Sequence, residues 1–177
     1  MRYAKEKVEK LCSFYVSDWH LATMLLPYIN KKVDEKVEVI AILETNLKEN
    51  IKVLLNKLNL KNMEKIDKID FDKTNAYKYE NIVKKIGDKL NNEIVIIVNG
   101  NKEYIEATNN NINKVIEKNI NKINKKIKIV NCYEVTEFNT NIKEILDEHD
   151  KILNTSGEKE KGEVFEGYSD VKINEAK

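Results

Sequence analysis

Short apolar runs alternate along the chain with segments whose apolar residues recur at helical spacing. Most of the runs are almost continuously apolar, which is typical of strands that are buried on both faces of a sheet. This alternation predicts an α/β protein, a three-layer sandwich in which helices cover both faces of a mostly parallel, five-stranded sheet. The predicted strands are residues 11–16, 37–43, 65–71, 93–98 and 127–133, of which 65–71 has the weakest pattern.

A helix is expected after each predicted strand. The first follows Ser17 and Asp18, either of which can cap it, and Pro27 should kink it because proline lacks an N–H and crowds the preceding turn. The last is expected to follow the cap Thr140 and to carry His149 on the same stripe as its apolar residues. The five predicted helices centre on residues 21–29, 51–58, 79–90, 105–123 and 142–153.

Helical periodicity ends after Asn154. A chain of 177 residues, 41% of them hydrophobic, is long enough for one domain with a substantial core. We therefore predict a single α/β domain over residues 1–154, followed by a charged, flexible C-terminal tail over residues 155–177.

Charge and apolar content argue against several classes of partner. The 31 Lys and Arg nearly balance the 30 Asp and Glu, so no basic excess favours nucleic acid, and the basic stretch 118–128 is interpreted as a solvated helix face. Residues 1–10 are charged, and no run approaches the roughly 18 apolar residues of a membrane span. Cys12 and Cys132 lie in apolar runs, which favours buried thiols over a disulfide. These features together predict a cytoplasmic protein without a nucleic-acid or membrane partner.

The junction between the first predicted strand and its helix lacks the phosphate-binding elements of a nucleotide-binding protein. Residues 17–19 are Ser-Asp-Trp, without the glycines that let a phosphate approach the backbone and without a lysine. Metal ligands are not clustered either, because His20 and His149 lie far apart and His149 fits a hydrogen-bonded core histidine. We therefore expect a non-catalytic domain, not an enzyme, with no metal and no cofactor.

The carboxyl ends of the strands are the expected place for a ligand. In parallel sheets, ligands bind beyond these ends, at a switch in strand order. The rule selects residues 15–20, 44–46, 99–101 and 133–137. The predicted ligand-binding residues are Tyr15, Asp18, Trp19, His20, Glu44, Gly100 and Tyr133.

Several of these residues also have a purely structural interpretation. Trp19 can form an aromatic wall with Tyr15 and Tyr133, or it can pack on a neighbouring helix and close the core. Gly100 fits a turn with positive φ better than it fits a phosphate contact. His20 is interpreted first as an ordinary, partly exposed residue and second as a ligand contact.

Short motifs occur in a definite order between residues 10 and 154. They are Cys12-Ser13-Phe14-Tyr15, Leu25-Leu26-Pro27-Tyr28-Ile29, Glu44-Thr45, Leu58-Asn59-Leu60, Asn131-Cys132-Tyr133 with Phe138, and His149 with Ile152-Leu153. In order and spacing they resemble the MEDS domains, the sensory domains of methanogens and methylotrophs. The resemblance implies a RecA/KaiC-like fold that has lost its nucleotide loop, and a sensory role attached to a signalling output. The chain departs from the family where Lys10 or Glu9 stands at the position of a frequent His, and where Asn101 replaces the Glu that often follows Gly100.

The leading hypothesis is a sensory or regulatory domain in signal transduction that binds a small ligand at the strand ends and signals through a partner. The alternative is a protein-interaction scaffold without a small ligand, acting as a homodimer or on a signalling protein. A residual nucleotide-binding enzyme is disfavoured, because the chain has no Gly-rich loop, Lys-Ser/Thr pair or Mg²⁺ ligand set.

Overall fold

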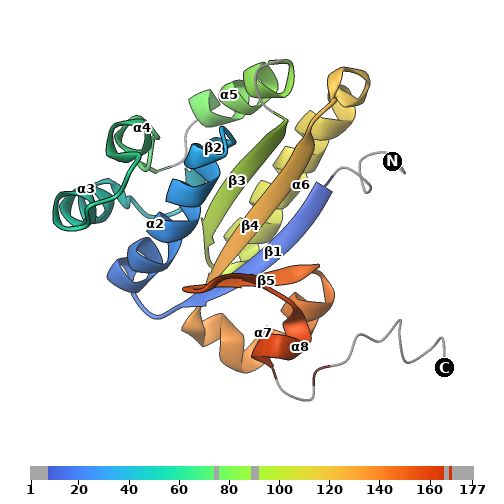
Figure 1. Cartoon of the computed structure of the whole chain (residues 1–177). Coiled ribbons are helices and arrows are strands. Elements are labelled where there is room, and N and C mark those ends of the chain that lie inside the picture. The colour runs from blue at the N-terminus through green and yellow to red at the C-terminus, as the bar shows by residue number, and fades with distance from the viewer. Residues whose placement is uncertain (1–7, 74–75, 89–91, 166–167, 169–177) are drawn as a thin grey trace.

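A six-stranded mixed sheet forms the centre of the computed structural model, which describes residues 8–73, 76–88, 92–165 and 168 (Figure 1). The strand order is β2-β3-β4-β1-β5-β6. Neighbouring strands are parallel except β5 and β6, which form an antiparallel pair. The strands are β1 (Val8–Tyr15), β2 (Glu38–Leu43), β3 (Glu93–Gly100), β4 (Lys126–Glu134), β5 (Lys151–Asn154) and β6 (Gly157–Lys159).

Helices pack on both faces of the sheet, so the predicted α/β architecture with a mostly parallel sheet is confirmed. One core lies under α2, α3 and α4, and a second core lies under α5, α6 and α7. Side chains of β3 alternate between them, with Val95 and Ile97 in the first core and Ile94 and Ile96 in the second. The helices are α2 (Asp18–Asp34), α3 (Lys48–Lys57), α4 (Met63–Asp67), α5 (Ala76–Ile86), α6 (Lys102–Lys118), α7 (Val135–Asp147) and α8 (Lys161–Val164), with a 3₁₀ turn η1 (Ile120–Lys122).

The path of the chain creates a switch in strand order beside β1. From β1 the chain crosses the first core through α2 and reaches β2 at the edge of the sheet. It then returns through β3 and β4, and α7 carries it across the second core to β5, on the other side of β1. The connections that follow the neighbouring strands β1 and β4 therefore leave toward opposite faces, which is the condition for a ligand crevice at their carboxyl ends.

Residues 65–71 do not form the strand that we predicted from their sequence. They contain the end of α4 and the segment that follows it. Met63 and Ile66 are three residues apart, so they lie on one side of a helical turn, and Ile66 is fully buried in the first core. In the described part of the chain, the segment that follows α4 pairs with the sheet through a single isolated parallel bridge, which joins Lys73 to Leu43.

The last predicted helix is displaced, because α7 starts at Val135 and ends at Asp147, and a strand follows. Thr140, the predicted cap, lies inside α7, and the N-cap position is Glu134. Ile152 and Leu153 lie in β5, where Ile152 is the register partner of Cys12 in β1. Two adjacent apolar residues are compatible both with the apolar stripe of a helix and with a short strand. They form a strand here because the side of β1 away from β4 is available for pairing. His149 thus lies in the turn before β5, buried as expected but not on a helix.

Secondary structure also continues past Asn154, where we predicted that it ends. β6 pairs with β5 through Ile152 and Lys159, and α8 follows it. A sixth strand therefore comes from a segment whose charged residues suggested solvent exposure. Residues 166–167 and 169–177 of the predicted tail, like Leu90 at the end of the third predicted helix, lie outside the described residues.

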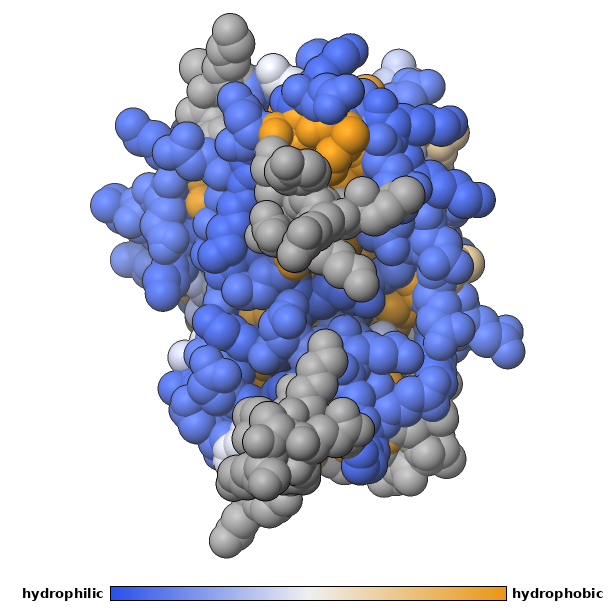
Figure 2. All heavy atoms as spheres, turned by 90° about the vertical axis from the view of Figure 1, so that its right-hand side faces the viewer, coloured by the Kyte–Doolittle hydropathy of each residue, from blue (hydrophilic) through white to orange (hydrophobic). Residues whose placement is uncertain are grey.

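The described helices include none that is long and apolar enough to span a membrane. The face seen in Figure 2 is largely hydrophilic, and its clearest hydrophobic area lies in the upper part of the view. This surface agrees with a composition in which 34% of the residues are charged.

Candidate functional site

A buried polar network joins the carboxyl ends of β1, β2 and β3. Its centre is Asn99, which is fully buried. The Asn99 Nδ2 donates to the hydroxyl of Tyr15 at 3.3 Å and to Thr45 Oγ1 at 3.0 Å, and its Oδ1 accepts from the Glu44 N–H at 3.0 Å. Since both ends of the amide have partners, its burial is compensated and the three strand ends are held together.

Gly100 follows this network and cannot be replaced without strain. Its φ is +151°, and a Cβ atom would lie 2.8 Å from Tyr104 Cδ1 and 3.0 Å from Glu44 Cβ. The predicted positive φ of Gly100 is therefore confirmed, although the residue ends β3, in register with Tyr133, and does not lie in a turn. The glycine lets the Glu44 side chain lie over the start of α6.

The amino terminus of α6 is satisfied by the chain itself. Glu44 Oε1 accepts from the Asn101 N–H at 3.2 Å, and Asn101 Oδ1 accepts from the Tyr104 N–H at 2.7 Å. A helix amino terminus normally attracts anions, because its N–H groups are unpaired and its dipole is positive there. Here the Glu44 carboxylate takes the place that an incoming phosphate would need.

The amino terminus of α2 is also capped internally. Ser17 Oγ accepts from the His20 N–H at 3.1 Å, and His20 Nδ1 accepts from the Val16 N–H at 3.0 Å. The cap predicted at Ser17 is thus confirmed, and His20 is partly exposed, as its structural interpretation requires. Asp18 adds an exposed carboxylate to the same turn, so this end of α2 also disfavours an anion.

Trp19 does not close the core, because 51% of it is exposed. Val16, three residues earlier in the sequence, is also an exposed apolar residue, with 65% of it exposed. The other interpretation, an aromatic wall of Trp19 with both tyrosines, is not formed either. Tyr15 belongs to the first core, whereas Tyr133 belongs to the second, on the opposite face of the sheet.

The seven predicted ligand-binding residues thus fall into three groups. Tyr15, Glu44 and Gly100 meet around Asn99. Asp18, Trp19 and His20 share the first turn of α2, which starts at the carboxyl end of β1. Tyr133 lies apart from both, packed against Phe14 and His149 with ring centroids 6.1 and 5.8 Å away.

On the face of the sheet that carries Tyr133, hydrogen-bonded side-chain amides lead from Asn109 through Asn131 to His149. Asn109 and Asn131 exchange side-chain hydrogen bonds of 2.8 and 3.1 Å, and Asn131 Nδ2 lies 3.0 Å from His149 Nε2. His149 Nδ1 lies 2.6 Å from the Ile145 carbonyl oxygen, so a ring protonated at Nδ1 donates there and accepts from Asn131. Burial lowers the pKa of His149 to about 4, which keeps the ring neutral. We interpret this chain as a structural core network.

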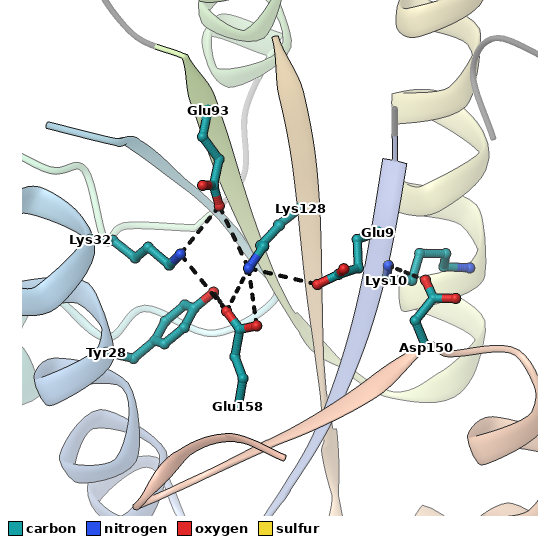
Figure 3. Close-up of polar contacts among 8 residues, drawn as sticks. All are labelled: Glu9, Lys10, Tyr28, Lys32, Glu93, Lys128, Asp150 and Glu158. Atoms are coloured by element: carbon teal, nitrogen blue, oxygen red, sulfur yellow. Dashed lines mark hydrogen bonds and ion pairs between the residues drawn. The ribbon is translucent and has the colours of Figure 1, made fainter. Parts of the chain in front are cut away.

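A second polar group, which the sequence analysis missed, lies at the amino-terminal edge of the sheet (Figure 3). Lys128 Nζ lies 2.7 Å from Glu158 Oε2, 3.6 Å from Glu9 and 3.8 Å from Glu93, while Lys32 Nζ lies 3.3 Å from Glu93 and 3.8 Å from Glu158. Both lysines are buried. The signal in the sequence is Lys128, a charge inside the apolar run of β4. We call these five residues the lysine–carboxylate cluster.

Within the lysine–carboxylate cluster, contact between Lys128 and Glu158 favours the charged forms of both side chains despite burial. Burial tends to raise the pKa of Glu158, but the hydrogen bond and charge of Lys128 and the Tyr28 hydroxyl, which donates at 3.0 Å, hold this pKa below its usual range. Burial tends to lower the pKa of Lys128, and contact with Glu158 outweighs it and raises that pKa. Glu9 Oε1 is buried without a hydrogen bond in the described structure and is met by the Lys128 ion pair. The cluster thus binds β6 to α2 and β4.

Nearby, backbone contacts secure the first strand. Lys10, in β1, donates its N–H to Asp150 Oδ2 at 2.8 Å. The Asp150 N–H donates to the Lys10 carbonyl oxygen at 2.7 Å. These contacts hold the turn before β5 against β1 and use the backbone, not the Lys10 amine.

Neither cysteine is placed as a reactive thiol, and the described residues form no cluster of metal ligands. Both cysteines are free and buried, as predicted, and they lie on opposite faces of the sheet. Burial raises the pKa of Cys12 to about 12 and raises that of Cys132 as well, so neither is a thiolate near neutral pH. In the part of the chain that the structure describes, no three His, Cys, Asp or Glu residues are placed to hold a metal ion.

Comparisons of the chain with protein-family models, with curated proteins and with solved structures found no match.

Proposed function

We propose that this protein is a non-catalytic sensory or regulatory domain that binds a small molecule at the carboxyl ends of β1 to β4 and signals through a partner protein. The observation that carries the proposal is the coincidence of two features at one edge of the sheet. The switch in strand order lies beside β1, and the network of Asn99, Tyr15 and Glu44 is built at the same strand ends.

The electrostatics of this edge support a neutral or cationic ligand. Glu44 lies at the start of α6, and Asp18 lies in the first turn of α2. A nucleotide phosphate would have to displace the first and would be repelled by the second. The exposed indole of Trp19 offers a surface on which a planar or cationic group can stack.

The same features support the family resemblance as part of the proposal. A parallel sheet whose first strand lies between β4 and β5, with helices on both faces, is compatible with a RecA/KaiC-like fold that does not use a phosphate loop. A MEDS-like sensory role in the cytoplasm is part of the same proposal.

A ligand screen that reads both stability and Trp19 tests the proposal. Because Trp19 is the single tryptophan, its fluorescence reports on one place in the molecule. We expect a neutral or cationic metabolite to raise the melting temperature and change Trp19 emission, while ATP and GTP do neither. A matched pair, Asp18→Asn and Asp147→Asn, separates the site from general charge effects, since only the first should weaken binding. A response to ATP or GTP, or to no compound in a broad metabolite panel, would contradict the proposal.

The second candidate is a protein-interaction scaffold, and the exposed pair Val16 and Trp19 favours it. The two residues are three positions apart in the sequence, and exposed large apolar side chains, above all aromatic ones, are typical of interaction surfaces. On this hypothesis, light scattering detects a dimer that Trp19→Ser converts to a monomer. A monomer at all concentrations that also captures no partner in a pull-down would rule the scaffold out.

A further inference from the structure

A small cavity lies on the face of the sheet that carries the second core, between α6 and the carboxyl end of α7. Its volume is about 260 Å³, slightly below the range for drug-sized ligands, so it suits a smaller metabolite. Its polar lining comes from β1, α6, β4 and the residue after α7, and includes Lys10, Glu106, Asn109, Asn131, Tyr133 and Glu148. Tyr133, the predicted ligand-binding residue that lies apart from the other six, thus belongs to a separate cavity.

The hydroxyl of Tyr133 is a hydrogen-bonding group that the described protein does not use. Tyr133 is only 2% exposed, yet its hydroxyl has no hydrogen bond to any described residue, whereas buried tyrosine hydroxyls usually have a partner. In the described structure, the side-chain atom that is sealed from solvent without a hydrogen bond is Glu9 Oε1, so the Tyr133 hydroxyl is not sealed and opens into the cavity. Burial raises the pKa of Tyr133, and the charges of Glu148 and Glu106 raise it further, so the hydroxyl stays protonated.

The floor of the cavity is preformed and offers hydrogen-bond acceptors. Asn109 Nδ2 donates to the Ile105 carbonyl oxygen at 2.9 Å and to Asn131 Oδ1 at 2.8 Å. Asn131 Nδ2 donates to Asn109 Oδ1 at 3.1 Å and faces His149 Nε2. The amide N–H groups are therefore occupied, while each Oδ1 accepts one hydrogen bond and has a second lone pair.

The rim of the cavity carries an excess of negative charge. Glu106 and Glu148 are exposed carboxylates, and Lys10 is the only cation among the described residues that line the cavity. Figure 3 shows that the Lys10 side chain leaves β1 on the side opposite to Glu9. Glu148 forms no ion pair with any described residue, and Glu106 meets Lys102 at 3.9 Å, although Lys102 lies closer to Glu144, at 3.0 Å. Both carboxylates can therefore receive a cationic group.

We infer that this cavity binds a small polar ammonium compound, whose charge is met by Glu106 and Glu148 and whose polar end is hydrogen-bonded by the Tyr133 hydroxyl. An ammonium group supplies the donors that the amide oxygens and carboxylates lack, whereas an anion would face two carboxylates and one lysine. The inference goes beyond the ligand site at the strand ends and does not rest on it, because the cavity uses none of residues 15–20, 44–46 and 99–101.

NMR titration of the full chain with three matched probes tests the inference. The probes 4-aminobutanol, 1,4-butanediol and 4-hydroxybutyrate share a short chain with a terminal hydroxyl and differ in the charge of the other end. We expect 4-aminobutanol to bind with a Kd of about 1 mM, as its size allows, and the other two to bind at least about tenfold more weakly. Chemical-shift changes should concentrate in residues 106–113 and 148–149.

Two variants separate the charges from the hydroxyl. Glu106→Gln with Glu148→Gln should weaken 4-aminobutanol binding by about tenfold, whereas Glu49→Gln with Glu117→Gln, the same charge change at exposed positions on α3 and α6, should stay within about twofold of the wild type. Tyr133→Phe removes a hydroxyl without a partner in the described protein. It should therefore keep the melting temperature and weaken 4-aminobutanol binding by about threefold or more.

Four outcomes would overturn the inference. They are no binding of 4-aminobutanol, equal affinity for the three probes, undiminished binding by Tyr133→Phe, and equal loss of binding in the two double variants. Shift changes confined to residues 16–20, 44–46 and 99–101 would also overturn it, while supporting the ligand site at the strand ends.

Discussion

Gly100 is the residue whose replacement should cost most at the carboxyl edge of the sheet. Its φ of +151° and the 2.8 Å approach of Tyr104 to a hypothetical Cβ are separate penalties. We expect Gly100→Ala to lower the free energy of unfolding by about 2–4 kcal/mol, because backbone strain and a close contact add. Urea unfolding measures the change.

Gly157 provides the matched control for this prediction. Its φ is +106°, but no atom lies within 4 Å of the position that a Cβ would occupy. Gly157→Ala should therefore cost only the backbone strain, about 1–2 kcal/mol. Equal losses in the two variants would show that the contact with Tyr104 and Glu44 does not matter.

His149 should make stability depend on pH between neutrality and mild acid. Its pKa is about 4 in the folded protein because of burial, and an unfolded histidine has a pKa of about 6.5. The folded state disfavours the proton, so stability is complete above about pH 6.5 and falls by up to about 3 kcal/mol as the pH drops toward 4. His149→Gln should remove this component in urea titrations between pH 7 and 4. An unchanged pH profile in the variant would contradict the neutral, buried ring.

At the residue scale, the sequence predicted the structural role of several side chains better than it predicted which residues they contact. Ser17 as a cap, Gly100 as a residue with positive φ and His149 as a core residue follow from local chemistry, which a pattern can reveal. The sequence left open whether Tyr15 and Tyr133 share one aromatic wall, because only the register of β1 and β4 shows that they lie on opposite faces of the sheet.

Among the elements, β6 depends on the lysine–carboxylate cluster. Glu158→Gln leaves Lys32 and Lys128 with one carboxylate fewer in a buried setting. We expect a loss of about 1–3 kcal/mol in the free energy of unfolding, less than for a fully buried pair because Glu9 and Glu93 remain. Glu160→Gln, at an exposed position two residues further on, makes the same charge change and should cost less than about 0.5 kcal/mol.

The same variant should change the response to acid. The pKa of Glu158 is held below its usual range, so its stabilising effect is complete above about pH 4.3 and is lost as the pH falls through the lowered folded pKa. Glu158→Gln should therefore remove part of the acid-induced loss of stability below pH 4.3. A variant as acid-sensitive as the wild type would contradict the role of this ion pair.

At the element scale, strands were predictable where they were long and apolar, and errors arose where they were short. β3 and β4 follow directly from their apolar runs. β5 has two buried residues, Ile152 and Leu153, and its identity depends on the long-range partner Cys12. β6 has no buried apolar residue and is held by Glu158, an interaction that no periodicity contains.

At the scale of the whole molecule, the strand order is what brings the candidate site together. β1 lies between β4 and β5, so segments far apart in the sequence meet at one edge. The general rule for parallel sheets predicted this edge before the order was known, but not which of its residues touch. To predict which residues touch, one must know the order of the strands. That order depends on how the helices divide between the two faces of the sheet.

The most direct test of the central claim is backbone-amide NMR of the wild-type protein with the metabolite that gives the largest stabilisation in the screen. The account predicts that chemical-shift changes concentrate in residues 16–20, 44–46 and 99–101. Changes concentrated instead around the lysine–carboxylate cluster or along β2, with residues 16–20 unaffected, would contradict a ligand site at the carboxyl ends of the strands.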